Sequence, residues 1–261
     1  MNVSNQCYFQ PWLKELGKQK PDKLWREFVT TNKLPAIEFS NATSAVYSSN
    51  IEGNPIDVNS YLASKFRGQR FKFKARERKE IEDLEAAYRF AQTHVLNEKN
   101  FLTAHGLLAA TLLTKSALGK YRVQMVYVYS RAGMEYAALE PEHVAGVMRE
   151  FFTDIKQLRD LSLDVERTFY HAALIHLVFV HIHPFMDGNG RAARLLEKWF
   201  LSSKLGRTAW QIPSEMYYKE NVADYYQNIK LGLNYYTLDY DRSVPFLTML
   251  VKSLAYPRKE S

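Results

Sequence analysis

This 261-residue sequence predicts an all-α fold, and three observations lead to that prediction. Apolar residues recur at three- and four-residue spacing along most of the chain, which is the period of an amphipathic helix. Helix start signals such as Glu140-Pro141 and Asp164, and stop signals such as Gly206 and Pro257, fall at the ends of these stretches. Only one short segment has the composition of strands.

The individual elements follow from the same pattern. Helices are expected over residues 10–18, 23–31, 36–52, 57–66, 76–96, 102–114, 141–159, 164–182, 190–205, 217–235 and 242–256. Residues 121–136 break the pattern, because β-branched and aromatic residues there flank Arg131-Ala132-Gly133. They predict a two-stranded hairpin with roughly six residues per arm. A lone hairpin is only marginally stable, so we expect it to lie against helices.

The composition is that of a folded globular protein, with 46% hydrophobic and 24% charged residues. It excludes disorder, collagen and coiled-coil rods. The length suits one compact unit, with an N-terminal helical region over residues 1–95 and a core over residues 96–261. The basic cluster at residues 71–79 is interpreted as a solvated helix start, with a hinge between the two parts as the alternative.

Charge and cysteine content limit the setting and the partners. Cys7 is the single cysteine, so no internal disulfide can form and a reducing, cytoplasmic setting is expected. The most apolar stretch, residues 173–185, is too short to cross a membrane, and the N-terminus lacks the features of a secretory signal. The net charge of +7 comes without a basic stripe interleaved with aromatics, so neither a membrane nor a nucleic acid is an expected partner.

The most informative segment is HIHPFMDGNGRAAR, residues 181–194. Pro184 disfavours helical geometry at His183, so a helix should end there and a loop should begin. Asp187-Gly188 and Asn189-Gly190 are strong turn pairs, after which a helix restarts. The segment therefore predicts two helices joined by a tight turn.

This turn has the features of an anion site. Glycines at alternate positions let backbone N–H groups point into one concavity, to which the next helix adds its positive end. Arg191 and Arg194 are neighbours on the first turn and could grip adjacent phosphates. Asp187 is an oxygen ligand of the type that Mg²⁺ prefers, and His183 can accept a proton at neutral pH. The set suits phosphoryl or nucleotidyl transfer.

Two simpler interpretations remain beside this one. The loop could only turn a corner, with His183 at a helix end and Asp187 as a helix cap. His181, His183 and Asp187 could instead form a metal-binding triad, although two histidines at i and i+2 point to different sides of a helix.

Residues 183–194 resemble, position for position, the HPFx(D/E)GNGRxxR motif of the Fic (filamentation induced by cAMP) family. The resemblance implies a Fic-type helical core with this segment as its catalytic loop. It also implies adenylylation, the transfer of AMP from MgATP to a Tyr, Thr or Ser hydroxyl of a target protein. A homodimer is left open.

The resemblance also implies roles for single residues. His183 would be the catalytic base and Asp187 would hold Mg²⁺, while Phe185 would anchor the loop in the core. The residues expected to bind the nucleotide are Gly188, Asn189, Gly190, Arg191 and Arg194, with Asn221 and Tyr225 as adenine contacts on a later helix. At Asn221-Val222 the chain departs from the Asn-Arg that the family commonly has.

A second motif lies upstream, in SSNIEGN at residues 48–54. Gly53 or Asn54 can end a helix, which places Glu52 at the negative end of the helix dipole and calls for a cation beside it. The stretch is similar to the inhibitory (S/T)xxxE(G/N) motif of many Fic proteins, over residues 48–53, with Ser48, Glu52 and Gly53 in its fixed positions. The resemblance implies that Glu52 pairs with Arg194 and autoinhibits the enzyme. Whether Glu52 also helps to remove AMP is left open.

The hairpin occupies the place of the flap that the family uses to dock an extended target segment. On that interpretation Val126, Tyr127 and Val128 offer a strand edge, and a simple cover for the core is the alternative. Two other functions also remain open: transfer of another phosphate-containing group, including Doc-like kinase chemistry, and a non-catalytic ATP-binding module. The target, the modified residue and the physiological trigger cannot be derived from the sequence.

Overall fold

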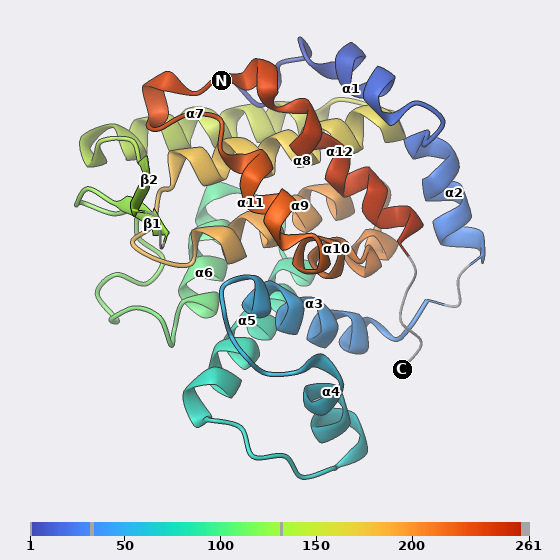
Figure 1. Ribbon diagram of the computed structural model, residues 1–261, viewed down its shortest axis with the longest axis vertical. Coiled ribbons are helices and arrows are strands. Elements are labelled where there is room, and N and C mark those ends of the chain that lie inside the picture. The colour runs from blue at the N-terminus through green and yellow to red at the C-terminus, as the bar shows by residue number, and fades with distance from the viewer. Residues whose placement is uncertain (1, 32–33, 131–132, 257–261) are drawn as a thin grey trace.

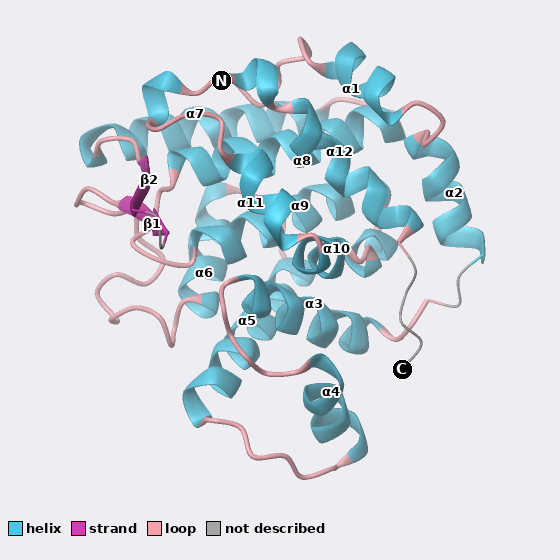
Figure 2. Ribbon diagram, viewed as in Figure 1, coloured by secondary structure: helices cyan, strands magenta, loops and turns pink. Residues whose placement is uncertain are grey.

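The structure is a computed structural model that describes residues 2–31, 34–130 and 133–256. Within these ranges the regular structure is helical apart from one two-stranded hairpin (Figure 2). The all-α prediction is therefore confirmed. The described helices are each too short or too polar to span a membrane.

The hairpin divides the helices of the chain into two groups. The N-terminal helices are α1 (Phe9–Leu16), α2 (Pro21–Thr31), α3 (Ile37–Ile51), α4 (Val58–Arg67), α5 (Ala75–Thr93) and α6 (Glu98–Leu108). The hairpin β1 (Tyr127–Ser130) and β2 (Gly133–Ala137) comes next. The remaining α-helices are α7 (Pro141–Asp160), α8 (Val165–Ile182), α9 (Asn189–Leu205), α10 (Ser214–Glu220), α11 (Val222–Ile229) and α12 (Val244–Lys252).

Helices α8 and α9 form the centre of the molecule (Figure 1). Almost every residue of α8 is buried, because α1, α2, α7, α9 and α12 all pack around it. Helix α3 packs on the other side of the core against α5 and α10. The short connection between α8 and α9 is partly buried, with Phe185 and Asn189 in the core and Met186 and Asp187 exposed.

One buried apolar cluster contains residues from before and after position 95. The fully buried Trp12 of α1, for example, donates its indole N–H to the carbonyl of Leu247 in α12, at 2.9 Å. The described residues thus share one buried apolar cluster. The division into two parts at residues 95 and 96 stays a prediction.

Two of the predicted helices do not run as far as expected. The helix expected over 217–235 is interrupted at Asn221, whose side-chain Nδ2 donates to the Tyr217 carbonyl at 2.9 Å while its backbone leaves the helical region. Asparagine side chains often compete with helical hydrogen bonds in this way. The helix expected over 102–114 ends at Leu108, because the chain turns back and brings Gly119 against Leu102, where a Cβ would meet the carbonyl oxygen at 2.6 Å.

The hairpin is shorter than the predicted 121–136. Its strands pair Tyr127 with Ala137 and contain a bulge after Val128, while the predicted turn residues Arg131 and Ala132 lie outside the described residues. The hairpin rests on helices as expected, since the Tyr136 hydroxyl donates to the His181 carbonyl at 2.6 Å. On its inner side, the Ala137 N–H donates to the carbonyl of Leu233 at 2.9 Å.

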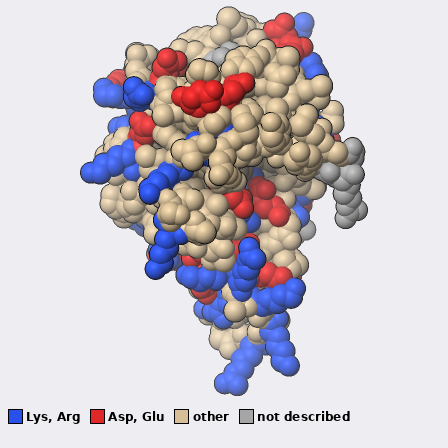
Figure 3. Space-filling model, turned by 90° about the vertical axis from the view of Figure 1, so that its left-hand side faces the viewer, with Lys and Arg blue, Asp and Glu red and all other residues tan. Residues whose placement is uncertain are grey.

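The predicted solvated helix start is found at residues 71–79. Helix α5 begins at Ala75, and α4 and the first turns of α5 project from the body of the molecule, where Lys and Arg side chains gather (Figures 1 and 3). Much of this charge is paired along α5, as Arg78 Nε lies 2.8 Å from Glu82 Oε1 and Lys79 Nζ lies 2.8 Å from Asp83 Oδ1. Such exposed pairs contribute little to stability.

Candidate functional site

The connection between α8 and α9 begins at His183, which ends α8 in the left-handed conformation with φ of 51°. A non-glycine residue in this conformation is strained unless its surroundings hold it. The His183 N–H donates to the Phe179 carbonyl at 3.0 Å, and the buried Arg122 donates through Nε to the His183 carbonyl at 2.7 Å. Arg122 also donates to the Leu139 carbonyl beyond the hairpin. Sequence reasoning missed Arg122, because no local pattern marks it.

The His183 ring is neutral and oriented. Its Nδ1 lies 3.3 Å from the Val180 carbonyl, which only accepts hydrogen bonds, so Nδ1 carries the proton and Nε2 keeps its lone pair. Within the described residues Nε2 has no hydrogen-bond partner. Burial lowers the pKa of His183 to about 4, against an opposing effect of the Val180 carbonyl. The ring is therefore neutral at neutral pH, with the lone pair of Nε2 free.

Asn189 and Phe185 hold the loop closed. The Asn189 side chain accepts from the Phe185 N–H at 2.9 Å and donates to the Phe185 carbonyl at 2.8 Å. Phe185 is fully buried, as expected of an anchor, and stacks on His105 with ring centroids 3.5 Å apart. His105 donates from Nε2 to the Asp187 carbonyl at 3.1 Å. His105 therefore also supports the loop, a contact that the sequence did not indicate.

Asp187 is the exposed carboxylate of the loop. One of its oxygens, Oδ1, accepts the Gly188 N–H at 2.6 Å. Among the described residues there is no cluster of three or more His, Cys, Asp or Glu side chains that could hold a metal without other ligands. The alternative of a His181–His183–Asp187 triad is therefore wrong, and His181 is turned instead toward Tyr240 and Ile229. A lone exposed carboxylate does fit Mg²⁺ that shares its coordination with phosphate oxygens.

The start of α9 has the properties of an anion site. Gly188, with φ of 80°, caps the helix, and a Cβ there would meet the Leu108 side chain at 3.1 Å. Arg191 is 6% exposed and reaches Glu80 Oε2 at 3.4 Å, while its buried Nε has no partner among the described residues. A buried donor without a partner is costly. The unpaired Nε therefore supports an acceptor such as a phosphate oxygen at this position.

Arg194 is fully buried and bound to the end of α3. Its Nε donates to Ser48 Oγ at 2.8 Å, and its Nη2 donates to the Ser48 carbonyl at 2.9 Å and to Glu52 Oε1 at 2.7 Å. Ser48, Glu52 and Arg194, far apart in the sequence, thus meet in one place. The cation that the sequence predicts beside Glu52 is Arg194.

The Glu52 carboxylate lies directly over the start of α9. A Cβ on Gly190 would meet Glu52 Oε1 at 2.3 Å, so only glycine fits there while the carboxylate is in place. Burial by itself would raise the pKa of Glu52, but the charges of Arg194 and Arg191 outweigh it and lower the pKa. Glu52 is therefore an anion bound in the position where the sequence predicts phosphates. Gly53 follows with φ of 95° and ends the segment.

Side chains from α10 and α11 also bind the end of α3. Lys219 Nζ donates to the Asn50 carbonyl at 2.6 Å, and the Tyr226 hydroxyl donates to the Ile51 carbonyl at 3.0 Å. These two bonds and the one from Arg194 satisfy the carbonyls that a helix end leaves free. Sequence reasoning missed both residues, because their partners are backbone atoms about 170 positions away.

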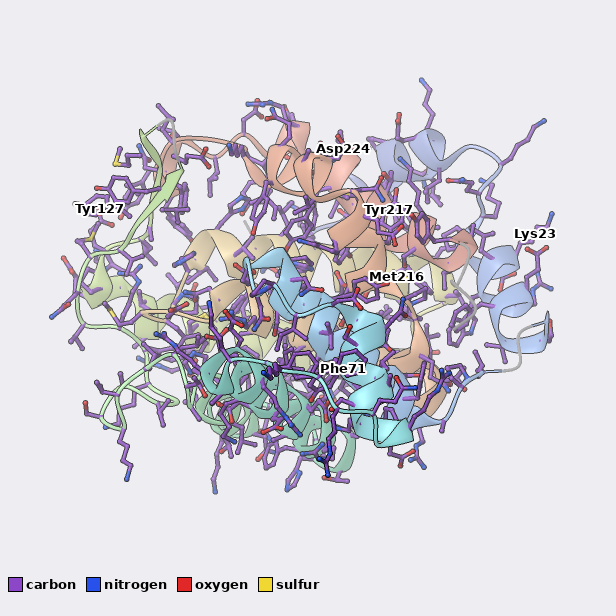
Figure 4. The ribbon with its side chains drawn as sticks, turned by 60° about the horizontal axis from the view of Figure 1, so that its bottom comes forward. Lys23, Phe71, Tyr127, Met216, Tyr217 and Asp224 are labelled. Carbon is purple, nitrogen blue, oxygen red and sulfur yellow. The ribbon has the colours of Figure 1, made fainter. Side chains whose placement is uncertain are left out.

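The predicted adenine contacts take other positions in this structure. Asn221 is half-buried and bonded to Tyr217, and Tyr225 is 1% exposed, with its hydroxyl near Arg194 and His176. Their contact with adenine stays a prediction. At the hairpin, Tyr127 is exposed (Figure 4) and Val126 and Val128 are half-buried, while β1 pairs with no described strand other than β2.

Part of this chain is similar to known proteins. Residues 95–201 match the model of the Fic/DOC family. Protein adenylyltransferase fic-1 of Caenorhabditis elegans is 30% identical over 155 residues, which cover 56% of this chain and 28% of that protein. Protein adenylyltransferase Fic of Culex quinquefasciatus is 27% identical over 161 residues, which cover 60% of this chain and 29% of that protein. The chain thus spans less than a third of the length of these curated relatives.

Solved structures agree with this result. A Fic family protein from Desulfovibrio desulfuricans G20 aligns with a TM-score of 0.71 and 22% identity, covering 95% of this chain and 72% of that one. Fic-1 from C. elegans aligns with a TM-score of 0.61 and 21% identity, and the alignment covers 95% of this chain and 68% of that one. The chain therefore has the Fic fold. The part that matches the Fic/DOC family model, residues 95–201, includes the loop from His183 to Arg194.

Proposed function

We propose that this protein is an autoinhibited adenylyltransferase that transfers AMP from ATP to a hydroxyl side chain of a target protein. The observation that carries the proposal is the Glu52 carboxylate on Arg194, 2.7 Å away, at the start of α9. An anion already lies in the site where the unbroken motif predicts phosphates. The names of the curated relatives support the same chemistry.

In the proposed reaction, Nε2 of His183 removes the proton of the target hydroxyl. The hydroxyl oxygen then attacks the α-phosphorus, and the bond to pyrophosphate breaks. The N–H groups from Gly188 to Gly190 receive phosphate oxygens, and Asn189 keeps the turn in shape. Arg191 and Arg194 take the outer phosphates. Asp187 would hold Mg²⁺, which supplies positive charge beside the phosphates when it is bound.

Autoinhibition follows from competition for Arg194. With Glu52 in place, all three guanidinium nitrogens already have acceptors, and the carboxylate covers Gly190. An outer phosphate with its negative charges cannot occupy the same position. We therefore propose that Glu52 must leave before ATP binds productively. The target segment would add to the free edge of β1, at Val126, Tyr127 and Val128.

The proposal is tested by label transfer to protein with Mg²⁺, using ATP labelled at the α-phosphate or at the γ-phosphate. Glu52→Gly should raise transfer of the α-label at least several-fold over the unchanged protein. His183→Ala in the same background should abolish it. Label from the γ-phosphate would instead show a kinase, and label from neither would favour another donor or a binding module. The cytoplasmic setting and the homodimer stay predictions.

A further inference from the structure

Arg194 is held from two directions. Its Nε and Nη2 are bound by Ser48 of α3 and by Glu52, which follows α3. Its Nη1 donates to the Tyr225 hydroxyl at 3.1 Å. Among the described residues, Tyr225 is the one hydrogen-bond partner of the guanidinium outside α3 and the Glu52 that follows it.

Tyr225 is itself held by a buried pair of side chains. Its hydroxyl lies 3.0 Å from His176 Nε2, and His176 Nδ1 lies 2.8 Å from Glu197 Oε2. The side chains of His176 and Glu197 are both fully buried. We call Tyr225, His176 and Glu197 the Tyr225 relay.

In the relay, each hydrogen bond has one donor and one acceptor. A carboxylate only accepts, so His176 Nδ1 carries the proton and Nε2 accepts from the Tyr225 hydroxyl. The lone pairs of the Tyr225 oxygen are then left for Arg194 Nη1. Each hydrogen bond thus determines which atom donates in the next one. As a result, the Tyr225 hydroxyl oxygen accepts from Nη1 of Arg194.

The relay is built on the helices that carry the catalytic loop. His176 lies two turns before His183 on α8, Glu197 lies three residues after Arg194 on α9, and Tyr225 lies on α11. None of the three belongs to α3. Movement of α3 would therefore take away Ser48 and Glu52 and leave the relay in place.

We infer that the Tyr225 relay is a positioning device that holds Arg194 in place for an outer phosphate of ATP once Glu52 has left it. The inference rests on the proposed function, because it concerns the state in which Glu52 has left. Without the Tyr225 acceptor, Nη1 of Arg194 would have no protein partner in that state, and ordering the guanidinium would weaken ATP binding. AMP lacks the outer phosphates, so its binding should not depend on the Tyr225 hydroxyl, which is the group that contacts Arg194.

The test is Tyr225→Phe in the Glu52→Gly background, because this change removes the hydroxyl and keeps the ring. Tyr218→Phe is the matched control. Tyr218 is equally buried and its hydroxyl donates to the same Glu197 Oε2, at 2.9 Å, but it does not contact Arg194. Binding of ATP and of AMP is measured by calorimetry, together with kcat and KM for α-label transfer.

Tyr225→Phe is expected to weaken ATP binding and raise KM by about tenfold, the usual effect of one bond to a charged group. AMP binding should stay within about twofold, as should kcat, because the attacked α-phosphate is untouched. Tyr218→Phe should bind ATP like its parent. Unchanged ATP binding in Tyr225→Phe, or equal losses in both variants, would overturn the inference. If Glu52→Gly itself binds no ATP, the proposed function fails first, and the inference fails with it.

Discussion

At the scale of single residues, Gly190 shows how closely the two motifs fit together. A Cβ at this position would meet Glu52 Oε1 at 2.3 Å and Arg194 Nη1 at 3.2 Å. The Glu52 carboxylate ends a flexible side chain and can move aside, but it would then give up its contact with Arg194. The contact between Glu52 and Arg194 therefore requires glycine at this position.

Gly190→Ala should destabilise the unchanged chain by about 1–3 kcal/mol, because the Glu52–Arg194 contact is broken. In the Glu52→Gly background the same change should cost at least about 1 kcal/mol less, since the obstructing carboxylate is absent. Urea unfolding of the four proteins measures this coupling. An equal cost in both backgrounds would show that Glu52 does not lie over Gly190 in solution.

At the scale of elements, the end of α3 is bound by α9, α10 and α11 together. Lys219 contributes a cation at the negative end of the helix, 2.6 Å from the Asn50 carbonyl. Favourable charge at a helix end stabilises the helix by a few tenths to about 1 kcal/mol. Release of Glu52 should therefore depend on Lys219 as well.

If Glu52 inhibits as proposed, Lys219→Met should raise α-label transfer by the otherwise unchanged chain at least about threefold, because the helix end before Glu52 is held less firmly. In the Glu52→Gly background, Lys219→Met should not raise α-label transfer further. Lys23→Met, on the exposed part of α2 far from this site (Figure 4), is the control. An increase that persists without Glu52 would mean that Lys219 acts elsewhere.

The edge of β1 in the hairpin is the proposed docking site for the target segment. The Val126 carbonyl accepts from the Ala138 N–H at 3.1 Å, so the backbone groups of Val126 face β2 and those of the next residue, Tyr127, face the free edge. Tyr127→Pro removes the Tyr127 N–H and should lower labelling of a genuine target at least about fivefold, because an added strand loses a backbone bond at the β1 edge. Tyr127→Ala, which keeps the N–H, should label the target normally. Undiminished labelling by Tyr127→Pro, with ATP binding intact, would count against docking there.

At the scale of the whole molecule, burial of histidines links stability to pH. Burial lowers the pKa of His105, His181 and His183 to about 4 each, while an unfolded histidine titrates near 6.5. Below pH 6.5 the unfolded chain therefore binds more protons than the folded one. The stability that these groups contribute is fully present above pH 6.5 and is lost as the pH falls toward 4.

The free energy of unfolding should consequently fall between pH 6.5 and pH 5, by up to about 1.4 kcal/mol per pH unit for each of the three histidines. This range lies above the usual titration of carboxylates, which adds its own loss at lower pH. Urea unfolding at half-unit steps from pH 7.5 to 5 measures the slope. A stability that stays constant over this range would show that these rings are not held neutral by the fold.

Local chemistry determined much of this protein. Helical periodicity, the turn pairs around Gly188 and Gly190 and the proline after His183 specify the two central helices and the loop between them, because these features act over a few residues. The negative end of the α3 dipole already required a cation beside Glu52. The resemblance of the two motifs to those of the Fic family indicated that this cation is Arg194.

Only the tertiary structure decided what distant side chains do to that loop. Arg122 behind His183, His105 beneath Phe185, and Lys219 at the end of α3 act through contacts between elements that no local pattern encodes. The break at Asn221 and the early end of α6 have the same origin, since packing overrode helical periodicity there. The sequence therefore determined the chemistry of the loop, and three-dimensional packing decided how Arg194 is held, because its partners come from helices that meet only in the folded chain.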